Sequence, residues 1–102
     1  MRIYEFFKES LQKRENTTFI NVDGKSFTYS QAYKYIKLYE ANLSTKNFKS
    51  IVYINKNHID HVILYLLCSK NNLTFASLDL DANPVDLTKQ IELMDNPIVI
   101  CN

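Results

Sequence analysis

The feature that most constrains the fold is a regular alternation of strand and helix patterns in the second half of the chain. Residues 50–54 (SIVYI) form a continuous apolar run, typical of a strand covered on both faces of a parallel sheet. Residues 73–78 (LTFASL) and 97–101 (PIVIC) are two further strand candidates. Because a helical pattern separates each strand from the next, the spacing predicts right-handed βαβ units in an α/β fold with a mostly parallel sheet.

The two crossover helices carry their own start signals. Asn57 can cap a helix over residues 58–70, whose apolar side chains cover most of its circumference, so we expect this helix to be deeply packed. Asn83 followed by Pro84 supplies an N-cap with proline at the first helical position. The inner face of this second helix is expected at Leu87, Ile91 and Met94.

The first half of the chain predicts a helix, a β-hairpin and a second helix. Apolar residues at helical spacing predict a helix over residues 3–13. Residues 18–22 (TFINV) alternate as a strand does, and the following Asp23-Gly24 pair is a signal for a tight hairpin turn. The sequence therefore places an antiparallel hairpin before the parallel units.

The stretch FTYSQAY joins the hairpin to the next helix. Phe27 is expected to end a strand with its ring toward the core, and Thr28 fits an N-cap. Gln31 lies three residues after Thr28, which is the spacing of a capping box. The buried stripe of the helix is expected at Tyr29, Ala32, Tyr33, Ile36, Tyr39 and Leu43.

Composition excludes several classes of protein. The chain has 102 residues, enough for one domain or a piece of one. Its formal net charge is +1 and it has no basic patch, and this charge distribution argues against nucleic-acid binding. Cys68 and Cys101 form no CxxC pair and indicate reduced thiols in a cytoplasmic protein. The N-terminus does not read as a signal peptide, and the apolar run VILYLLC is too short to span a bilayer. We expect no membrane association.

Residues that could carry chemistry have simpler interpretations. His58, Asp60 and His61 lie together at a helix start but have no further ligand at useful spacing, so no metal site is expected. Cys68 and Cys101 are expected to be inert core thiols. The acidic run at residues 79–81 is interpreted as solvated turn. A base-stacking surface could use Tyr29, Tyr33, Tyr35 and Tyr39, but helical spacing favours core and rim positions. The sequence thus predicts no catalytic, cofactor-binding or metal-binding residue.

The order of these pieces resembles the N-terminal segment of the adenylate-forming (AMP-dependent synthetase/ligase) superfamily. That superfamily includes acyl-CoA synthetases, the adenylation domains of nonribosomal peptide synthesis and D-alanine–carrier protein ligases. Its chains open with a helix and a hairpin, followed by an (L/F)TY-x-(E/Q)-L helix start, matched here by residues 27–33. Residues 51–70 and 69–102 match the next parts in order, and the short link between Leu43 and Ile51 is most similar to amino-acid-activating members.

The resemblance implies that residues 1–102 are a single, partial N-terminal subdomain of an AMP-binding (adenylation) domain. The family activates a carboxylate with ATP, releases pyrophosphate and passes the acyl group to the thiol of a carrier protein or CoA. Its phosphate loop, its magnesium- and ribose-binding acids and its catalytic lysine would follow Asn102. ATP and Mg are therefore implied for the full-length enzyme, and none is expected to bind this segment. The segment would be scaffold, with the remainder of the adenylation domain as its partner.

Departures from the family pattern concern asparagine and one serine. Asn71 or Asn72 stands where the family has a helix-ending glycine, Asn47 falls near another customary glycine, and Ser77 replaces a proline. Since asparagine is the next-best residue in the left-handed conformation, we expect it to take the place of glycine here.

Two function classes follow. The chain is either a fragment of an ATP-dependent, AMP-forming ligase or a small self-standing, non-catalytic α/β interaction module. A fragment should expose a large apolar face, whereas a self-standing protein should protect its sheet edges with charge. The uncharged strands at residues 51–54 and 98–101 favour the fragment.

Overall fold

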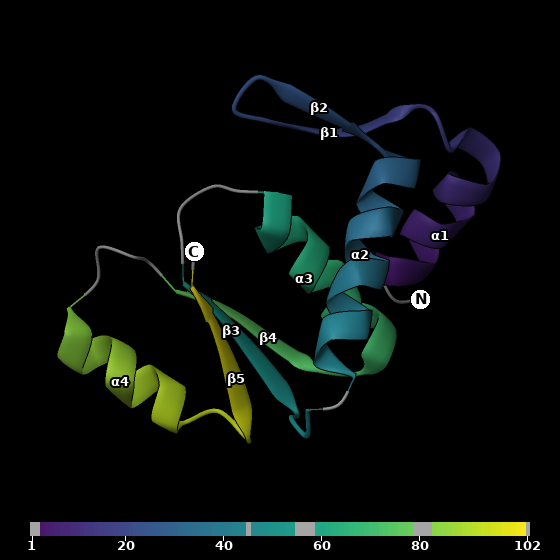
Figure 1. The fold of residues 1–102 in the computed structure, drawn as a ribbon. Helices are drawn as coiled ribbons and strands as arrows, with labels where there is room; N and C mark the ends of the chain where they lie inside the picture. The colour runs from purple at the N-terminus through teal and green to yellow at the C-terminus, as the bar shows by residue number, and fades with distance from the viewer. Residues whose placement is uncertain (1–2, 45, 55–58, 79–82, 102) are drawn as a thin grey trace.

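A computed structural model describes residues 3–44, 46–54, 59–78 and 83–101. Helices and strands follow the predicted order, and Figure 1 shows the hairpin and the first two helices stacked beside a small sheet. The elements are α1 (Ile3–Arg14), β1 (Thr18–Val22), β2 (Lys25–Thr28), α2 (Tyr29–Leu43), β3 (Ser50–Ile54), α3 (Ile59–Asn71), β4 (Thr74–Leu78), α4 (Pro84–Glu92) and β5 (Pro97–Cys101). None of the described helices combines the length and apolarity that a membrane span requires.

The strands form two separate sheets. β1 and β2 pair antiparallel on their own, while β4, β3 and β5 form a three-stranded sheet with β3 in the centre and both pairings parallel. The crossover from β3 to β4 contains α3. The crossover from β4 to β5 contains α4 and passes back over β3, and α4 lies on the opposite side of the sheet from α3 (Figure 1). Two crossovers that run in opposite directions on opposite faces share one hand, as the βαβ rule requires. The predicted fold class is confirmed.

The core lies between the parallel sheet and the three helices α1, α2 and α3. Every residue of β3 is buried, and Ile51 and Tyr53 point into the same cluster as the buried side of α3. Phe7 of α1 contacts Phe19 of β1 and Tyr29 of α2, with ring centroids 5.0 and 5.6 Å apart, and so joins the hairpin to the helices. The continuous apolar strand predicted from the sequence is therefore the central strand of the sheet.

Local backbone signals also behave as predicted. Asp23 and Gly24 both have positive φ, 50° and 82°, as a primed hairpin turn requires. Thr28 accepts a hydrogen bond from the Gln31 backbone N–H, and the Gln31 side chain accepts one from the Thr28 N–H, which completes the capping box. Asn72 takes φ 57° just after α3, so asparagine holds the left-handed position that a glycine holds in the family pattern.

The helix α4 is the least buried part of the described fold. Asn83 caps it as predicted, accepting a hydrogen bond from the Val85 N–H at 2.8 Å. Leu87 and Ile91 form its inner side, but they are only half-buried, and Met94 lies just beyond the end of the helix at Glu92. The predicted residues do lie on the inner side of α4, but none of them is fully buried in this segment. The predicted Asn57 cap lies outside the described residues.

Candidate functional site

The residues with potential chemistry are engaged in packing. His61 on α3 is stacked against Tyr53 and Phe75, with ring centroids 6.0 and 5.6 Å away. Burial, followed by the charge of Asp60 and a hydrogen bond to it, raises the pKa of Tyr39 to about 12. Within the described ranges, no three His, Cys, Asp or Glu side chains gather closely enough to hold a metal ion. His58 and the acidic run at residues 79–81 lie outside these ranges.

Cys68 is a core thiol, as predicted. Its side chain is buried on α3, and its Sγ lies 4.0 Å from the carbonyl oxygen of Thr74. Burial raises the pKa of this thiol to about 12, so almost no thiolate is present at neutral pH. Cys68 therefore cannot serve as a nucleophile in this arrangement. The side chain of Cys101 lies outside the part of the chain that the structure describes.

The tyrosines of α2 occupy core and rim positions, also as predicted. Tyr29, Tyr33 and Tyr39 are half-buried and pack against the core cluster. Tyr35 points outward, where its ring meets the edge of Phe27 at 6.1 Å. Three of the four rings are therefore used in packing against the core.

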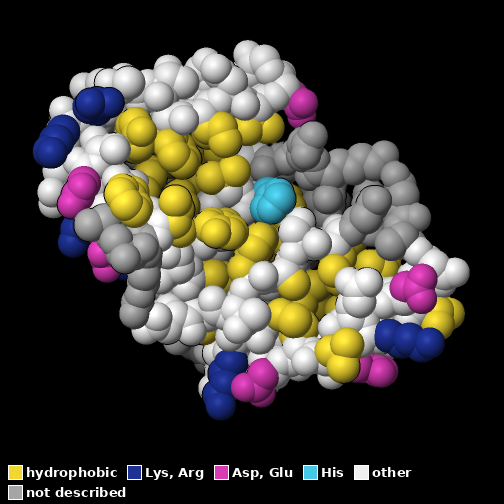
Figure 2. Space-filling view, turned by 180° about the vertical axis from the view of Figure 1, so that it is seen from behind, with side chains coloured by type: hydrophobic (Ala, Val, Ile, Leu, Met, Phe, Trp, Pro, Cys, Tyr) yellow, Lys and Arg dark blue, Asp and Glu magenta, His cyan; other side chains and the backbone are white. Residues whose placement is uncertain are grey.

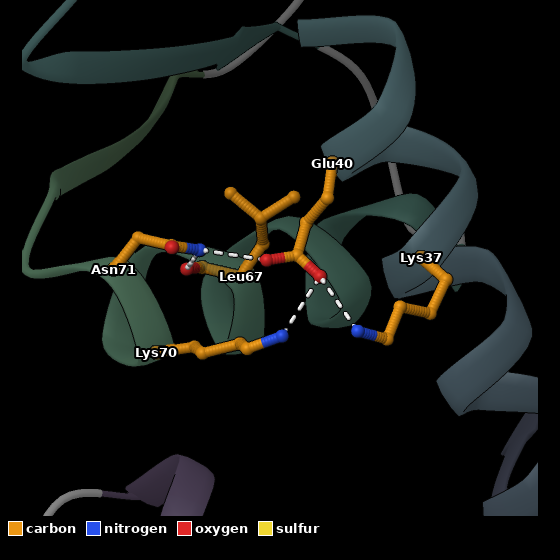
Figure 3. A network of polar contacts seen from close by, with 5 residues as sticks. All are labelled: Lys37, Glu40, Leu67, Lys70 and Asn71. Atoms are coloured by element: carbon orange, nitrogen blue, oxygen red, sulfur yellow. Dashed lines mark hydrogen bonds and ion pairs between the residues drawn. The ribbon is translucent and has the colours of Figure 1, made fainter. Parts of the chain in front are cut away.

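A cluster of polar side chains ties α2 to α3. Figure 3 shows the carboxylate of Glu40 between two lysines. Lys70 of α3 lies 2.8 Å from it, and Lys37, on α2 like Glu40 itself, lies 3.8 Å from it. Asn71 donates to the other carboxylate oxygen at 3.3 Å and to the Leu67 carbonyl at 2.9 Å. Burial alone would raise the pKa of Glu40, but the hydrogen bonds from Lys70 and Asn71 and the charges of both lysines outweigh it and lower that pKa. This cluster joins two helices and has the character of a structural clamp.

The most informative surface is an uncharged hollow between α1, the hairpin and α3. It has a volume of about 330 Å³, and none of its lining residues is charged. Its walls include Ile3 and Phe6 of α1, Phe19 of β1, and Val62 and Tyr65 of α3. Phe6 is 54% exposed and Tyr65 is 49% exposed, so large apolar side chains face solvent here.

A second uncharged hollow continues the first toward the sheet. Its volume is about 530 Å³, it shares Ile3 and Tyr65 with the first hollow, and it extends to Leu73, Thr74 and Phe75 at the start of β4. The ring of Tyr65 meets the edge of Phe75 at 5.8 Å, which links α3 to the sheet. We call the surface formed by both hollows the uncharged face. Figure 2 looks onto this side, where apolar side chains gather around the described histidine.

The uncharged face has the composition of an interface centre. The chain is 23% charged overall, yet the residues lining both hollows include no Lys, Arg, Asp or Glu. Depletion of charge with enrichment of Tyr and Phe is the compositional signal of a buried contact. The first hollow is lined mainly by apolar side chains, whereas the second also includes Ser69, Asn72 and Thr74, so the face combines apolar and uncharged polar groups.

The sequence predicted exposed apolar surface from two uncharged strands, and the two strands differ. The strand at residues 51–54 is covered within this chain by β4, β5 and α3, whereas β5 is an end strand on which Val99 of the predicted run 98–101 is 44% exposed. Other exposed large apolar side chains lie on all four helices and just after α4: Ile3, Phe6, Tyr35, Leu38, Tyr65, Val85 and Leu93. A usable signal was present in Tyr65, a large aromatic residue on the side of α3 away from its buried leucines.

Comparisons with known proteins bear on the fold. No protein-family model matches the sequence, and no curated protein matches it either. Among solved structures, NpsA–ThdA, an artificially fused adenylation–PCP di-domain from Klebsiella oxytoca, matches with a TM-score of 0.82 and 16% identity over 98% of this chain. A structure of VinN with L-aspartate matches with a TM-score of 0.81 and 17% identity over 90% of this chain. The N-terminal subdomain of Klebsiella oxytoca NpsA matches with a TM-score of 0.76 and 12% identity over 89%.

These likenesses establish the fold. The order of helices and strands that carried the resemblance is confirmed: the chain has the fold of an N-terminal segment of nonribosomal adenylation domains. It spans only 25% of the NpsA subdomain chain, 24% of the VinN chain and 20% of the fused chain.

Proposed function

We propose that this chain is the N-terminal segment of an ATP-dependent, AMP-forming ligase that activates a carboxylate as an adenylate and transfers it to a thiol. The observation that carries the proposal is the fold match over 98% of this chain to a solved adenylation–PCP protein, of which it spans 20%. A fold that fits so completely into a small part of a larger enzyme is best explained as a part of such an enzyme.

The role of this segment is structural. A nucleotide site needs closely spaced backbone N–H groups that glycine makes accessible to phosphates. The chain has one glycine, Gly24, and it lies in the hairpin turn. These residues therefore do not fit an ATP or magnesium site of their own, and catalysis is assigned to the remainder of the enzyme. The segment supplies a three-stranded sheet and its helical cover.

An amino acid is the substrate class that we propose. The short link between α2 and β3 is similar to amino-acid-activating members of the family, and the VinN structure contains L-aspartate. A carrier protein is the proposed acceptor, because one matching protein is a fused adenylation–PCP di-domain. We also propose the cytoplasm as the compartment, because Cys68 and Cys101 are far apart in sequence and form no CxxC pair.

The test begins with the gene. The reading frame is sequenced beyond the codon for Asn102, and the longest product is expressed and assayed for amino-acid-dependent exchange of pyrophosphate into ATP. We expect a frame that soon encodes a Ser/Thr/Gly-rich loop ending in lysine, and exchange that is lost when this lysine is replaced. A stop codon directly after Asn102, with no complementing frame nearby, would contradict the proposal. The chain would then be a non-catalytic interaction module that binds through the uncharged face.

A further inference from the structure

The hairpin forms one wall of a hollow that carries charges of both signs. Figure 1 shows the hairpin reaching out beyond α2 on the side where α3 begins. A hollow of about 400 Å³ lies there, a volume within the range of small-molecule sites. We call it the mixed-charge hollow, because two carboxylates, one ammonium and two aromatic rings line it. Its described lining residues come from the hairpin, α2 and α3: Val22, Asp23, Lys25, Phe27, Tyr35, Ile59 and Asp60.

The charged groups of the hollow come from two places in the fold. Asp23 and Lys25 flank Gly24 in the hairpin turn, where both are exposed. Asp60 comes from the first turn of α3, where it is half-buried and accepts a hydrogen bond from Tyr39 of α2. A carboxylate has about four acceptor positions, so a bond from a tyrosine is compatible with further donors. The hollow therefore combines one anchored carboxylate with two charges on a turn.

The remaining wall of the hollow is apolar and aromatic. Phe27 and Tyr35 meet edge to face, with ring centroids 6.1 Å apart. Phe27 is half-buried and Tyr35 is 38% exposed, so both rings offer surface to a ligand. Aromatic rings pack well against other rings and also attract organic ammonium ions. A ligand that suits this hollow should therefore carry an apolar, preferably aromatic, group beside its charges.

The charges of the hollow discriminate between classes of ligand. A simple anion would face two carboxylates, and a neutral apolar compound would cover charged groups without giving them a partner. A simple cation could bind the carboxylates but would be repelled by Lys25. A zwitterion offers a partner to each sign of charge. An amino acid is such a zwitterion at neutral pH, and an aromatic side chain would suit the two rings.

We propose that the mixed-charge hollow binds an aromatic amino acid in its zwitterionic form. Asp60 and Asp23 bind the ammonium group, and Lys25 binds the carboxylate. The side chain of the ligand packs against Phe27 and Tyr35. The amino acid is an effector at this site and not a substrate, because these residues do not fit a nucleotide site. The inference concerns residues of this segment and does not depend on the proposed ligase function.

Fluorine NMR on the longest gene product tests the proposal. The tyrosines are replaced by 3-fluorotyrosine, and the Tyr35 signal is assigned by its loss in Tyr35→Phe. Phenylalanine is the probe, and we expect the Tyr35 signal to shift and to saturate with a Kd of about 1–10 mM, as a small ligand in an open hollow should give. A Tyr35 signal that does not move at about 50 mM phenylalanine would overturn the proposal.

Two charge variants and a matched control identify the site. Asp60→Asn keeps an acceptor for Tyr39 but removes the charge, and it should weaken phenylalanine binding at least about 10-fold. Lys25→Gln should weaken it about threefold, because this lysine is exposed. Asp86→Asn is the control, since Asp86 is also the acid in the first turn of a helix but does not line the hollow. Equal effects of Asp60→Asn and Asp86→Asn would contradict the site.

Two analogues of the probe test the need for both charges. Phenethylamine lacks the carboxylate and should bind about threefold more weakly than phenylalanine, whereas 3-phenylpropionate lacks the ammonium and should bind at least about 10-fold more weakly. Phenethylamine that binds as tightly as phenylalanine would overturn the zwitterion assignment.

The two proposals fail separately. Pyrophosphate exchange without a shift of the Tyr35 signal would overturn the amino-acid site and leave the ligase function in place. A saturable Tyr35 shift that Asp60→Asn weakens, in a product without exchange activity, would support the amino-acid site and contradict the ligase function.

Discussion

Replacing Lys70 with methionine tests whether one charged contact holds α2 against α3. The Lys70 ammonium lies 2.8 Å from Glu40, and both side chains are largely shielded, with 26% and 23% of their surfaces exposed. The same ammonium lies 5.6 Å from the centre of the Tyr4 ring, and methionine removes the charge while keeping an unbranched apolar side chain. The substitution therefore removes both charged contacts of Lys70 and keeps an apolar side chain at that position.

The expected loss can be estimated from the geometry. Hydrogen bonds to charged groups contribute about 1.5–3 kcal/mol, and removal of Lys70 also leaves Glu40 with fewer partners in a partly buried position. Asn71 still donates to Glu40 at 3.3 Å and limits the penalty. We expect Lys70→Met to lower the free energy of unfolding by about 2 kcal/mol, which is a fall of roughly 10 °C in Tm for a domain of this size.

Lys37→Met is the matched control for the same carboxylate. Lys37 lies 3.8 Å from Glu40, and 52% of its side chain is exposed. Exposed ion pairs of this kind contribute about 0–1 kcal/mol. Thermal and urea unfolding followed by circular dichroism would measure both variants. Equal losses for the two lysines, or a loss below about 0.5 kcal/mol for Lys70→Met, would refute the assignment of the clamp to Lys70.

The pH dependence gives an independent check on the same cluster. The pKa of Glu40 is lowered in the folded chain, so its contribution to stability is fully present above its ordinary value of 4.5 and is lost as pH falls through the lower folded value. The pKa of Lys70 is raised, chiefly by its hydrogen bond to Glu40, so its contribution is fully present below 10.5 and is lost as pH rises through the higher folded value. Glu40→Gln should therefore flatten the decline of stability below pH 4.5. An unchanged decline would show that other carboxylates cause it.

Three further substitutions test the local structure. Thr28→Ala should cost about 1 kcal/mol of unfolding free energy, because it removes the hydroxyl oxygen that accepts from the Gln31 N–H, whereas Thr28→Ser keeps that acceptor and should cost much less; urea unfolding distinguishes them. Gly24→Ala should lower stability by about 1 kcal/mol although no atom lies near the added Cβ, because φ is +82° there, and a Tm equal to that of the parent would contradict this. In a Cys101→Ser background, Cys68 should react with a thiol reagent at pH 8 only in urea, since burial raises the pKa of its thiol to about 12; rapid labelling of the folded chain would show that α3 opens readily.

The fold could be predicted from the sequence because its local and long-range signals agree. The turn at Asp23-Gly24, the cap at Thr28 and the buried run at residues 50–54 each have one favourable structure, and these structures are compatible with one another. Asparagine was expected to take a left-handed position where the chain leaves this helix, and Asn72 does so with φ 57°. What periodicity could not supply was the sheet order, in which β5 returns to the far side of β3 and makes β3 the centre.

The exposed apolar surface was also hard to predict, because periodicity does not show how the elements are arranged in space. Whether an apolar residue is covered depends on which elements become neighbours, and the sequence alone does not give that arrangement. Ile51 is apolar and fully buried within this segment, whereas Phe6 and Tyr65 are apolar and remain exposed because α1 and α3 present them on their outer sides. An apolar residue in the sequence therefore corresponds to a buried core position in β3 and to an exposed surface position on α1 and α3. This exposed surface also borders the start of β4. Exposed apolar side chains that gather in one place mark a contact surface, whereas the buried run of β3 belongs to the core.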